Sequence, residues 1–250
     1  MRISHVPPGE MSFVGNTATL RCCQSNRFSR HHFLIAFLIP PLIQTIAMKL
    51  YFAPNTCSLS PHIVLHELGL PFDLVRVNNK TKHTSEGGNF LDINPKGYVA
   101  ALVLDNGEVL TEGPAILQYL ADLKPEAQLA PPAGSWARVR LQETLNFITA
   151  EIHAGCSPLF NSALPNEVNA MFREKLFRRL DTMETTLSQQ DFLHGRFGVA
   201  DAYLYTVLTW LPLFSIDIAR WPDLARFMAR IGARASVKAA LAAEDAALGC

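Results

Sequence analysis

Two spacings of apolar residues divide this chain and restrict what it can fold into. Between residues 48 and 111, short apolar runs alternate with loops, as expected for the strands of a small sheet. From residue 135 onward, apolar residues recur with the period of an α-helix. The chain therefore combines a layered α/β domain with an all-α domain.

The α/β domain is predicted to occupy residues 48–124. Its strands are expected at 49–53, 72–77, 99–104 and 108–110, with helices at 60–68, just before residue 94 and from residue 115. Asn106 and Gly107 predict a type I′ hairpin turn between the last two strands, because both central positions of that turn need positive φ. The other connections have crossover length, so the order β-α-β-α-β-β-α is the thioredoxin-like arrangement.

The all-α domain is predicted to occupy residues 135–250, after a proline-rich linker at 125–134. Its helices are expected at 135–156, 167–187, 200–211, 222–231 and 236–248. The third of these is apolar nearly all round, which predicts a central buried helix.

The first 47 residues form a separate segment without sustained periodicity. They carry four arginines against one acid, so their net charge is +3 and that of the remainder is 18 − 21 = −3. Arginines before the apolar run at 33–39 imitate a secretory signal, but Pro40 and Pro41 interrupt the apolar region. We expect a leader of unassigned structure, disordered or upstream of a true start at Met48.

Composition excludes several classes of protein. Lys and Arg together number 22 and balance 22 acidic residues, so there is no basic excess for binding nucleic acid. The apolar run of the leader is too short and too broken to span a membrane. Five cysteines are an odd number without metal-like spacing, which favours a reducing, cytoplasmic location over a disulfide framework.

Cys57 is the first candidate for chemistry. It lies in the loop after the first strand, three residues before the predicted N-cap Ser60, where helix N–H groups and the helix dipole favour a thiolate. The motif lacks the second cysteine of a dithiol oxidoreductase, so redox chemistry here would need an external thiol. A buried structural cysteine is the alternative, and the position alone leaves both open.

His62 and His66 share one face of the first predicted helix. The spacing suits a metal, but no companion ligand stands at a suitable distance, so we expect no metal and an ordinary helix surface. Cys156 is predicted to belong to the core.

Two further patterns have both a functional and an ordinary interpretation. The spacing of Asn146, Ala150 and His153 places them on one face of a helix. This face either lines a cleft or is the side of the helix that solvent covers. Glu112 and Gly113, between a strand and a helix, offer a carboxylate and free N–H groups for a small zwitterion, or are simply a helix start.

Six segments carry a family resemblance when they are taken together. They are residues 48–51, 57–62, 94–97, 106–107, 110–122 and 199–204. In this order and at these distances they resemble the bacterial beta-class glutathione S-transferases, from Met48 almost to the C-terminus.

The resemblance implies a thioredoxin-like glutathione-binding domain, an all-α domain that supplies the electrophile pocket, and a homodimer. Glutathione is the cosubstrate and no cofactor is bound. By the same match, Cys57 contacts the glutathione sulfur, Lys82 approaches the glycine carboxylate, and Val99 pairs its backbone with the cysteinyl part. Glu112 and Gly113 bind the γ-glutamyl group.

The helical side of the site is also implied by the resemblance. Its matching residues are Asn146, Ala150, Glu151, Ile152 and His153, with His153 nearest the thiol. Conjugation also needs apolar walls for the electrophile, and we expect Phe52, Phe160 and Trp210 to supply them.

Three departures from the family pattern stand out. Val99-Ala100 replaces a Val-Pro with a cis bond, and a cis bond costs about 2.5–4 kcal/mol before Ala against roughly 0.5–1 before Pro. Either the bond stays cis or the loop turns trans, and we expect weaker or altered glutathione binding. Gly198 replaces the Ser or Thr that pairs with Asp201 in a capping box, and Ala154 replaces a basic residue after the site histidine.

The expected function is a cytoplasmic, detoxifying glutathione transferase that adds the glutathione thiolate to hydrophobic electrophiles. Cys57 and His153 would position or activate the sulfur. The alternatives are glutathione-dependent thiol–disulfide exchange through a Cys57 mixed disulfide, or a non-catalytic glutathione- or ligand-binding protein. Fold alone does not choose among them.

Overall fold

The computed structural model describes residues 48–249, so the predicted leader at 1–47 lies outside the described residues. Its strands are β1 (Met48–Phe52), β2 (Phe72–Arg76), β3 (Ala101–Val103) and β4 (Val109–Thr111). They form one sheet in the order β2-β1-β3-β4, with β1 parallel to β2 and antiparallel to β3. The predicted strands and the closing hairpin are confirmed.

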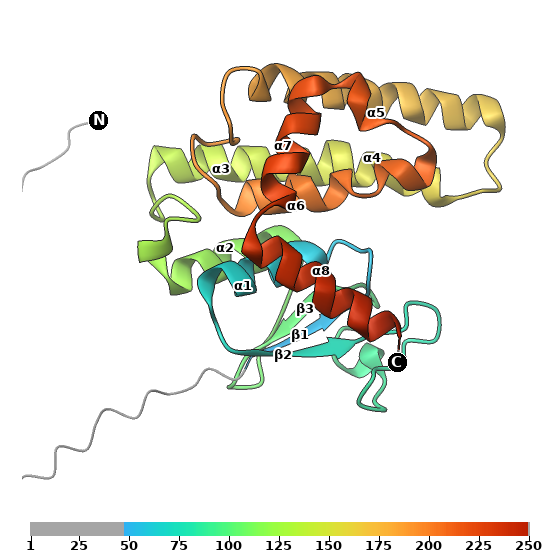
Figure 1. Ribbon diagram of the computed structural model, residues 1–250. Coiled ribbons are helices and arrows are strands. Elements are labelled where there is room, and N and C mark those ends of the chain that lie inside the picture. Colours follow the sequence, from blue (N-terminus) through green and yellow to red (C-terminus); the bar gives the residue numbers. More distant parts are fainter. Residues whose placement is uncertain (1–47, 250) are drawn as a thin grey trace, which may run out of the picture. The chain divides into compact units, whose positions relative to one another are not determined.

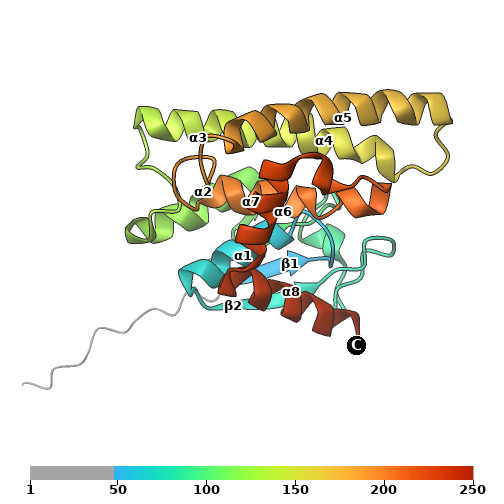
Figure 2. The same ribbon diagram turned by 45° about the horizontal axis from the view of Figure 1, so that its top comes forward.

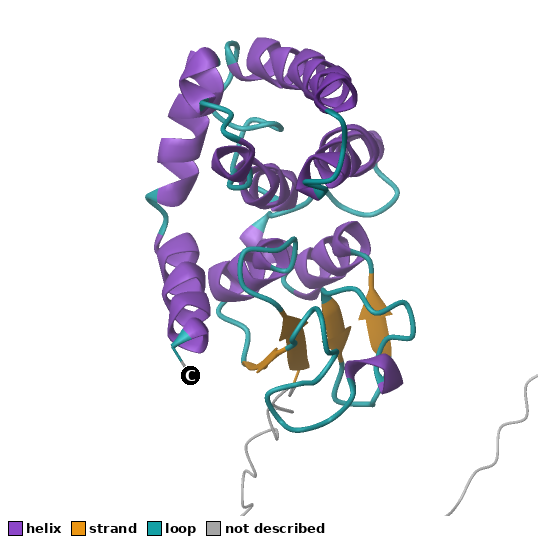
Figure 3. Cartoon of the chain, turned by 90° about the vertical axis from the view of Figure 1, so that its right-hand side faces the viewer, coloured by secondary structure: helices purple, strands orange, loops and turns teal. Residues whose placement is uncertain are grey.

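Helices α1 (Leu59–Leu68) and α2 (Gly113–Leu123) cover one face of this sheet (Figures 1 and 3). Side chains alternate along β1, since successive residues of a strand point to opposite faces. Leu50 and Phe52 belong to the core under the helices. Tyr51 packs on the other face against Phe90, with ring centroids 5.7 Å apart.

The N-cap of α1 lies two residues before the predicted Ser60. The helix begins at Leu59, with Ser58 as its N-cap, and Ser60 instead donates its hydroxyl to the Cys57 carbonyl at 2.9 Å. The predicted end is confirmed, because Gly69 closes the helix with φ of 57°. Cys57 therefore lies nearer the helix than its sequence position indicated.

The hairpin between β3 and β4 is not a type I′ turn. Positive φ is confined to Gly107, and its N–H donates to the Leu104 carbonyl at 2.9 Å. This is the pattern of a type I turn followed by a left-handed glycine. The Asn106 side chain accepts from the Glu108 N–H at 3.0 Å, which stabilises this turn.

The second half is helical, as predicted (Figure 2). Its helices are α3 (Trp136–Phe147), α4 (Ala154–Cys156), α5 (Asn166–Leu187), α6 (Val199–Leu208), α7 (Pro222–Gly232) and α8 (Ala235–Leu248). Short 3-10 turns lie at Phe90–Asp92, Pro125–Ala127, Ser157–Phe160, Leu211–Phe214 and Ile218–Arg220. Every residue of α6 is buried, so the predicted central helix is confirmed.

The predicted helix over 135–156 is interrupted by a π-helical segment, Ile148–His153, between α3 and α4. A π turn closes from residue i to i+5 and so advances less per residue than an α turn. Side chains after the segment therefore face a different direction from the one that an unbroken α-helix predicts.

Helix α8 returns to pack along α1, on the side of the sheet domain (Figures 1 and 2). The prediction of an ordinary surface for His62 is wrong, because α8 covers it completely. Its Nδ1 lies 3.3 Å from Glu244 Oε1, and Glu244 Oε2 accepts from the Asn55 N–H at 3.3 Å.

The described residues hold neither a metal-type cluster of side chains nor a membrane-spanning helix. No three His, Cys, Asp or Glu side chains between residues 48 and 249 gather where they would hold a metal ion. None of the helices within that range is both long and apolar enough to cross a membrane.

Candidate active site

Two adjoining cavities open where the sheet domain meets the helical domain. The inner cavity is lined by Cys57, Asn94, Lys96, Tyr98, Val99, Ala100, Thr111, Glu112, Gly113, Pro114, Thr149, His153 and Tyr203. The outer cavity is lined by Asn55, Thr56, Cys57, Asn79, Lys82, Tyr98, Val99, His153, Ser157, Phe160 and Trp210. Cys57 and His153 border both, so the two predicted catalytic residues meet at the junction of the cavities.

Cys57 holds its thiol against the opposite loop. Its Sγ donates to the Val99 carbonyl at 3.2 Å. Burial raises the pKa of the Cys57 thiol to about 11, against the lowering effect of the Cys57 and Ala100 N–H groups, and the Glu112 charge raises it further. The predicted thiolate is therefore wrong, and Cys57 is a neutral hydrogen-bond donor at physiological pH.

The Val99–Ala100 peptide bond is cis, which answers the question left open by the missing proline. Both residues line the inner cavity, and Val99 also lines the outer one. The Val99 carbonyl lies beside the Cys57 thiol, and its predicted pairing with the cysteinyl part of glutathione stays a prediction.

His153 ends the π segment, and its ring nitrogen Nδ1 points toward Tyr203 of α6. Its Nδ1 lies 2.7 Å from the Tyr203 hydroxyl, and its ring meets Trp210 edge-on with centroids 5.0 Å apart. Burial lowers the pKa of His153, so the ring is neutral at physiological pH. With Tyr203 as donor to Nδ1, the ring carries its own proton on Nε2.

Glu112 and Gly113 lie at the turn from β4 into α2, so their predicted position between a strand and a helix is confirmed. Glu112 has φ of 69°, which is uncommon for a residue other than glycine and often marks a functional turn. Its carboxylate receives Lys96 Nζ at 2.8 Å. Gly113 opens α2, Pro114 has no N–H, and Ala115 and Ile116 donate theirs to the Glu112 carbonyl at 3.0 Å, so the Gly113 N–H is the one of these four positions left to a ligand.

Lys82, another predicted glutathione-binding residue, lines the outer cavity. Lys82 Nζ donates to the Gly97 carbonyl at 2.8 Å from within the lining. Phe160 and Trp210 form an apolar wall, with ring centroids 5.7 Å apart, and this part of the prediction is confirmed. Phe52 is different, because it is buried in the sheet core and reaches neither cavity.

The remaining four predicted residues of the helical wall line neither cavity. Asn146 and Ala150 are exposed, Glu151 accepts from Arg179 Nε at 2.6 Å, and Ile152 is fully buried in the core. The π segment explains this separation, because it turns His153 away from the face that Asn146 and Ala150 share.

Sequence reasoning missed the polar residues that complete the site. Tyr203 lies inside a helix that looks wholly apolar, and its hydroxyl also accepts from Thr149 Oγ1 at 3.4 Å. Lys96 stands in one of the family-like segments without a role of its own. Tyr98 lines both cavities, and only its position next to Val99 could have indicated it.

Family models match both halves of the chain. The glutathione S-transferase N-terminal domain matches residues 56–123, and the glutathione S-transferase C-terminal domain matches residues 147–235. The chain belongs to the glutathione S-transferase family. The predicted fold, a thioredoxin-like domain followed by helices, is that of the family and is confirmed.

Individual relatives narrow the class. Glutathione S-transferase GstA of Escherichia coli O157:H7 is 42% identical over 79% of this chain and 98% of its own length. A sphingomonad glutathione S-transferase in complex with glutathione is 42% identical over 79% of this chain and 98% of its own, with a TM-score of 0.77.

A beta-class enzyme from Sphingomonas chungbukensis is 42% identical over 78% of this chain and 98% of its own, with a TM-score of 0.76. The predicted resemblance to the bacterial beta class is thus confirmed, as is the prediction of a glutathione transferase that uses glutathione as cosubstrate.

Proposed function

We propose that this enzyme joins the glutathione thiolate to small hydrophobic electrophiles at the junction of the inner and outer cavities. It would act in the cytoplasm, in detoxification and as a homodimer. The observation that carries the proposal is that Cys57 and His153 border both cavities from opposite domains. A sulfur atom at this junction would meet both side chains.

The charged residues of the cavities match the charged ends of glutathione. Lys96 and Glu112 are one cation and one anion at the rim of the inner cavity. Their ion pair is exposed, and such pairs contribute only about 0–1 kcal/mol, so a ligand can replace it at little cost. The ammonium of the γ-glutamyl end would pair with Glu112 and its carboxylate with Lys96, while Lys82 would receive the glycine carboxylate.

The backbone at Val99 would hold the middle of glutathione. If its carbonyl accepts the cysteinyl N–H of the ligand, the Cys57 thiol is released from that carbonyl and can donate to the glutathione sulfur. His153 would donate from Nε2 to the same sulfur, held in place by Tyr203. Two donors in a half-buried site stabilise a thiolate.

The reaction follows from this placement. The thiol proton leaves to solvent, and the sulfur electron pair attacks the electrophilic carbon. With an aryl halide a carbon–sulfur bond forms and the halide ion departs. The wall of Phe160 and Trp210 in the outer cavity would hold the apolar ring.

The raised pKa of Cys57 favours conjugation over the exchange alternative. Thiol–disulfide exchange needs a Cys57 thiolate, whereas a pKa of about 11 keeps the thiol protonated at neutral pH. As a donor, the same neutral thiol supports the conjugation reaction.

The exposed face of α3 fits the proposed homodimer. Trp136 and Val139 expose 68% and 44% of their surface there, which is typical of a surface that another protein covers. Asn146 and Ala150 follow on the exposed side of the same helical run. In a homodimer they would serve the glutathione of the partner subunit rather than their own.

Steady-state turnover of 1-chloro-2,4-dinitrobenzene with glutathione tests the proposed function. We expect turnover in the wild type and a loss of kcat of about ten- to a hundredfold in Cys57→Ala, because a hydrogen bond to a charged group such as the thiolate is worth about 1.5–3 kcal/mol. A His153→Phe variant removes the second donor and should lose a similar amount. Cys156→Ala changes a buried thiol outside both cavities and serves as the control.

A glutathione mixed disulfide of 2-mercaptoethanol is the second substrate. If Cys57→Ala abolishes its reduction and the wild type does not turn over the aryl halide, the protein is an exchanger and the proposal fails. Binding of glutathione without either reaction would identify a binding protein and would also contradict it.

A further inference from the structure

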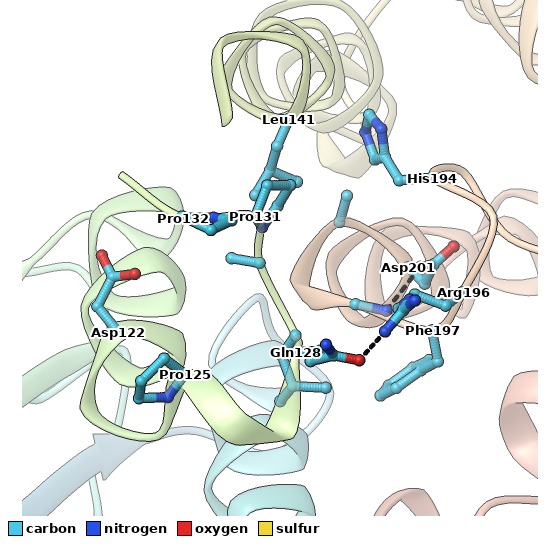
Figure 4. Close-up of a pocket in the computed structure, with 14 residues that line it drawn as sticks. Asp122, Pro125, Gln128, Pro131, Pro132, Leu141, His194, Arg196, Phe197 and Asp201 are labelled. Carbon is cyan, nitrogen blue, oxygen red and sulfur yellow. Dashed lines mark hydrogen bonds between the residues drawn. The ribbon is translucent and has the colours of Figure 1, made fainter. Parts of the chain in front are cut away.

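Helix α6 borders two cavities with different kinds of polar group. Its start borders a third cavity beside the linker, whose walls are largely apolar (Figure 4). There Asp201 accepts the N–H groups of Leu193 and Gly198, each at 2.9 Å. Backbone donors cannot reverse, so Asp201 keeps one arrangement. Tyr203, two residues further along α6, borders the inner cavity, and its partners are side chains that can reverse.

Tyr203 belongs to a short chain of hydrogen bonds that ends at His153. Thr149 donates its hydroxyl to the carbonyl of Leu145, four residues back on the same helical run, at 2.8 Å. Thr149 Oγ1 lies 3.4 Å from the Tyr203 hydroxyl, which in turn lies 2.7 Å from His153 Nδ1. The three side chains all line the inner cavity. A backbone carbonyl is thus connected to the ring of the histidine at the junction of the cavities.

Each hydroxyl in this chain has one proton and more than one acceptor. Leu145 receives the Thr149 proton in the shorter of its two bonds, a bond that threonine commonly makes to the carbonyl four residues before it. The lone pairs of Thr149 Oγ1 are then available to Tyr203. The Tyr203 proton can therefore point to His153 or to Thr149, and both choices leave each hydroxyl with an acceptor.

The direction of the Tyr203 bond decides the tautomer of His153. If Tyr203 donates to Nδ1, the ring carries its proton on Nε2. If Tyr203 donates to Thr149, its oxygen accepts a proton from Nδ1 instead, and Nε2 presents a lone pair. The first tautomer donates a hydrogen bond to a thiolate, whereas the second accepts a proton from a thiol.

The other titratable side chains around this chain do not compete for the ring. Those that line the two cavities are Cys57, Lys82, Lys96, Tyr98 and Glu112. No hydrogen bond within residues 48–249 joins any of them to His153 or Tyr203. Burial raises the pKa of Tyr203 well above its ordinary value, so its hydroxyl stays protonated and only changes direction.

We propose that Thr149 and Tyr203 are positioning residues that let His153 change tautomer and take the thiol proton of glutathione. The inference rests on the proposed function. With Tyr203 turned to Thr149, Nε2 accepts the proton as the S–H bond breaks, and the electron pair stays on sulfur. The imidazolium then donates from Nε2 to the thiolate and from Nδ1 to Tyr203. Once the sulfur has attacked and the halide has left with its electron pair, Nε2 releases the proton to solvent.

Nitrogen NMR of the enzyme with isotope-labelled histidine measures the tautomers without substrate. We expect the wild type to show both tautomers of His153. Thr149→Val keeps the shape but has no acceptor for Tyr203, so the ring should hold its proton on Nε2 alone. Thr149→Ser supplies a hydroxyl again and should restore both tautomers. The control is Thr182→Val on the exposed side of α5, which removes a bond of the same kind to the Arg178 carbonyl and should change nothing.

The ultraviolet absorbance of the bound glutathione thiolate and the kinetics with 1-chloro-2,4-dinitrobenzene are the second measurement. Thr149→Val should lower both the thiolate fraction at neutral pH and kcat about tenfold, with an unchanged KM for glutathione. Tyr203→Phe should lose a similar amount. Adding Thr149→Val to Tyr203→Phe should cost nothing more, because Thr149 acts only through Tyr203.

Three results would overturn the proposal. These are a wild-type ring with its proton on Nε2 alone, wild-type tautomers in Thr149→Val, or additive losses in the double variant. Thermal melting establishes folding, and the wild-type spectrum remains decisive if a variant does not fold. A wild type without aryl halide turnover contradicts the proposed function, whereas unchanged tautomers in an active Thr149→Val enzyme contradict the tautomer change alone.

Discussion

The two sides of the domain junction differ in how their polar groups are bonded. On the side of Cys57, polar groups have partners that a ligand can replace: a thiol on a carbonyl, and the exposed pair of Lys96 and Glu112. On the linker side, the buried Asp201 has two fixed backbone partners and the walls are apolar. The difference shows that a reactive site needs polar groups whose hydrogen-bond partners a ligand can replace. A polar group with fixed backbone partners only stabilises the local fold.

Glu112→Gln is expected to have the largest effect, because it removes the anion that the ammonium of glutathione would meet. Losing a charge-assisted hydrogen bond costs about 1.5–3 kcal/mol, so the KM for glutathione should rise at least tenfold with little change in kcat. Steady-state kinetics and calorimetric titration measure this rise. Glu108→Gln, on the exposed hairpin, is the control. An unaltered KM in Glu112→Gln would show that Glu112 does not bind the ammonium of glutathione.

Alkylation of Cys57 is expected to be slow, and its rate should keep rising to an unusually high pH. Its pKa of about 11, against an ordinary 9.0, lowers the thiolate fraction at pH 7.5 about a hundredfold. A more basic thiolate is also more nucleophilic, which recovers about tenfold of this loss. The rate should therefore be about tenfold below that of a free thiol.

Peptide mapping by mass spectrometry after timed iodoacetamide treatment measures this rate. It should rise with pH toward about 11, since deprotonation continues to that value. Cys156 is fully buried with its pKa raised to about 12 and should react more slowly still. A Cys57 rate that levels off below pH 9 would show a ready thiolate and would contradict the role of neutral donor.

Gly198→Thr sharpens the comparison from the linker side and has the smallest expected effect. Thr is normally the better N-cap by a few tenths of a kcal/mol. Here its Cβ would stand 2.7 Å from the Leu129 carbonyl oxygen, and overpacking costs typically 1–3 kcal/mol. The melting temperature should fall by a few degrees, with glutathione turnover retained.

Gly155→Ala in α4 is the matched control for that substitution. Its added Cβ would make an ordinary contact at 3.7 Å with Leu176, so the helix should gain about 0.5–1 kcal/mol. If Gly198→Thr also stabilised the protein, the close approach of the linker would not be a real constraint.

Local patterns predicted the elements of this fold well. Short apolar runs bounded by loops indicated all four strands, and Gly69 marked the end of α1. They failed where a distant segment decides. The burial of His62 comes from Glu244 on α8, 182 positions away, and no local pattern contains that partner.

The candidate site was predictable in its residues and less so in its chemistry. Cys57, His153 and Glu112 line one cavity, and their contacts with glutathione stay predictions. The protonation of Cys57 was wrong, because helix position suggests a thiolate while the burial that raises its pKa arises only when the chain folds. Tyr203 was missed because an apolar helix hides a hydroxyl that has its partner on another helix.

The π segment gives one helical run two separate directions. Asn146 and Ala150 face the outside of the molecule, whereas His153 lines the cavities. A π turn is equivalent to one inserted residue in an α-helix. The same residues wound as a regular α-helix would place the imidazole seven positions after Asn146 on the same outer face, out of reach of the substrate sulfur.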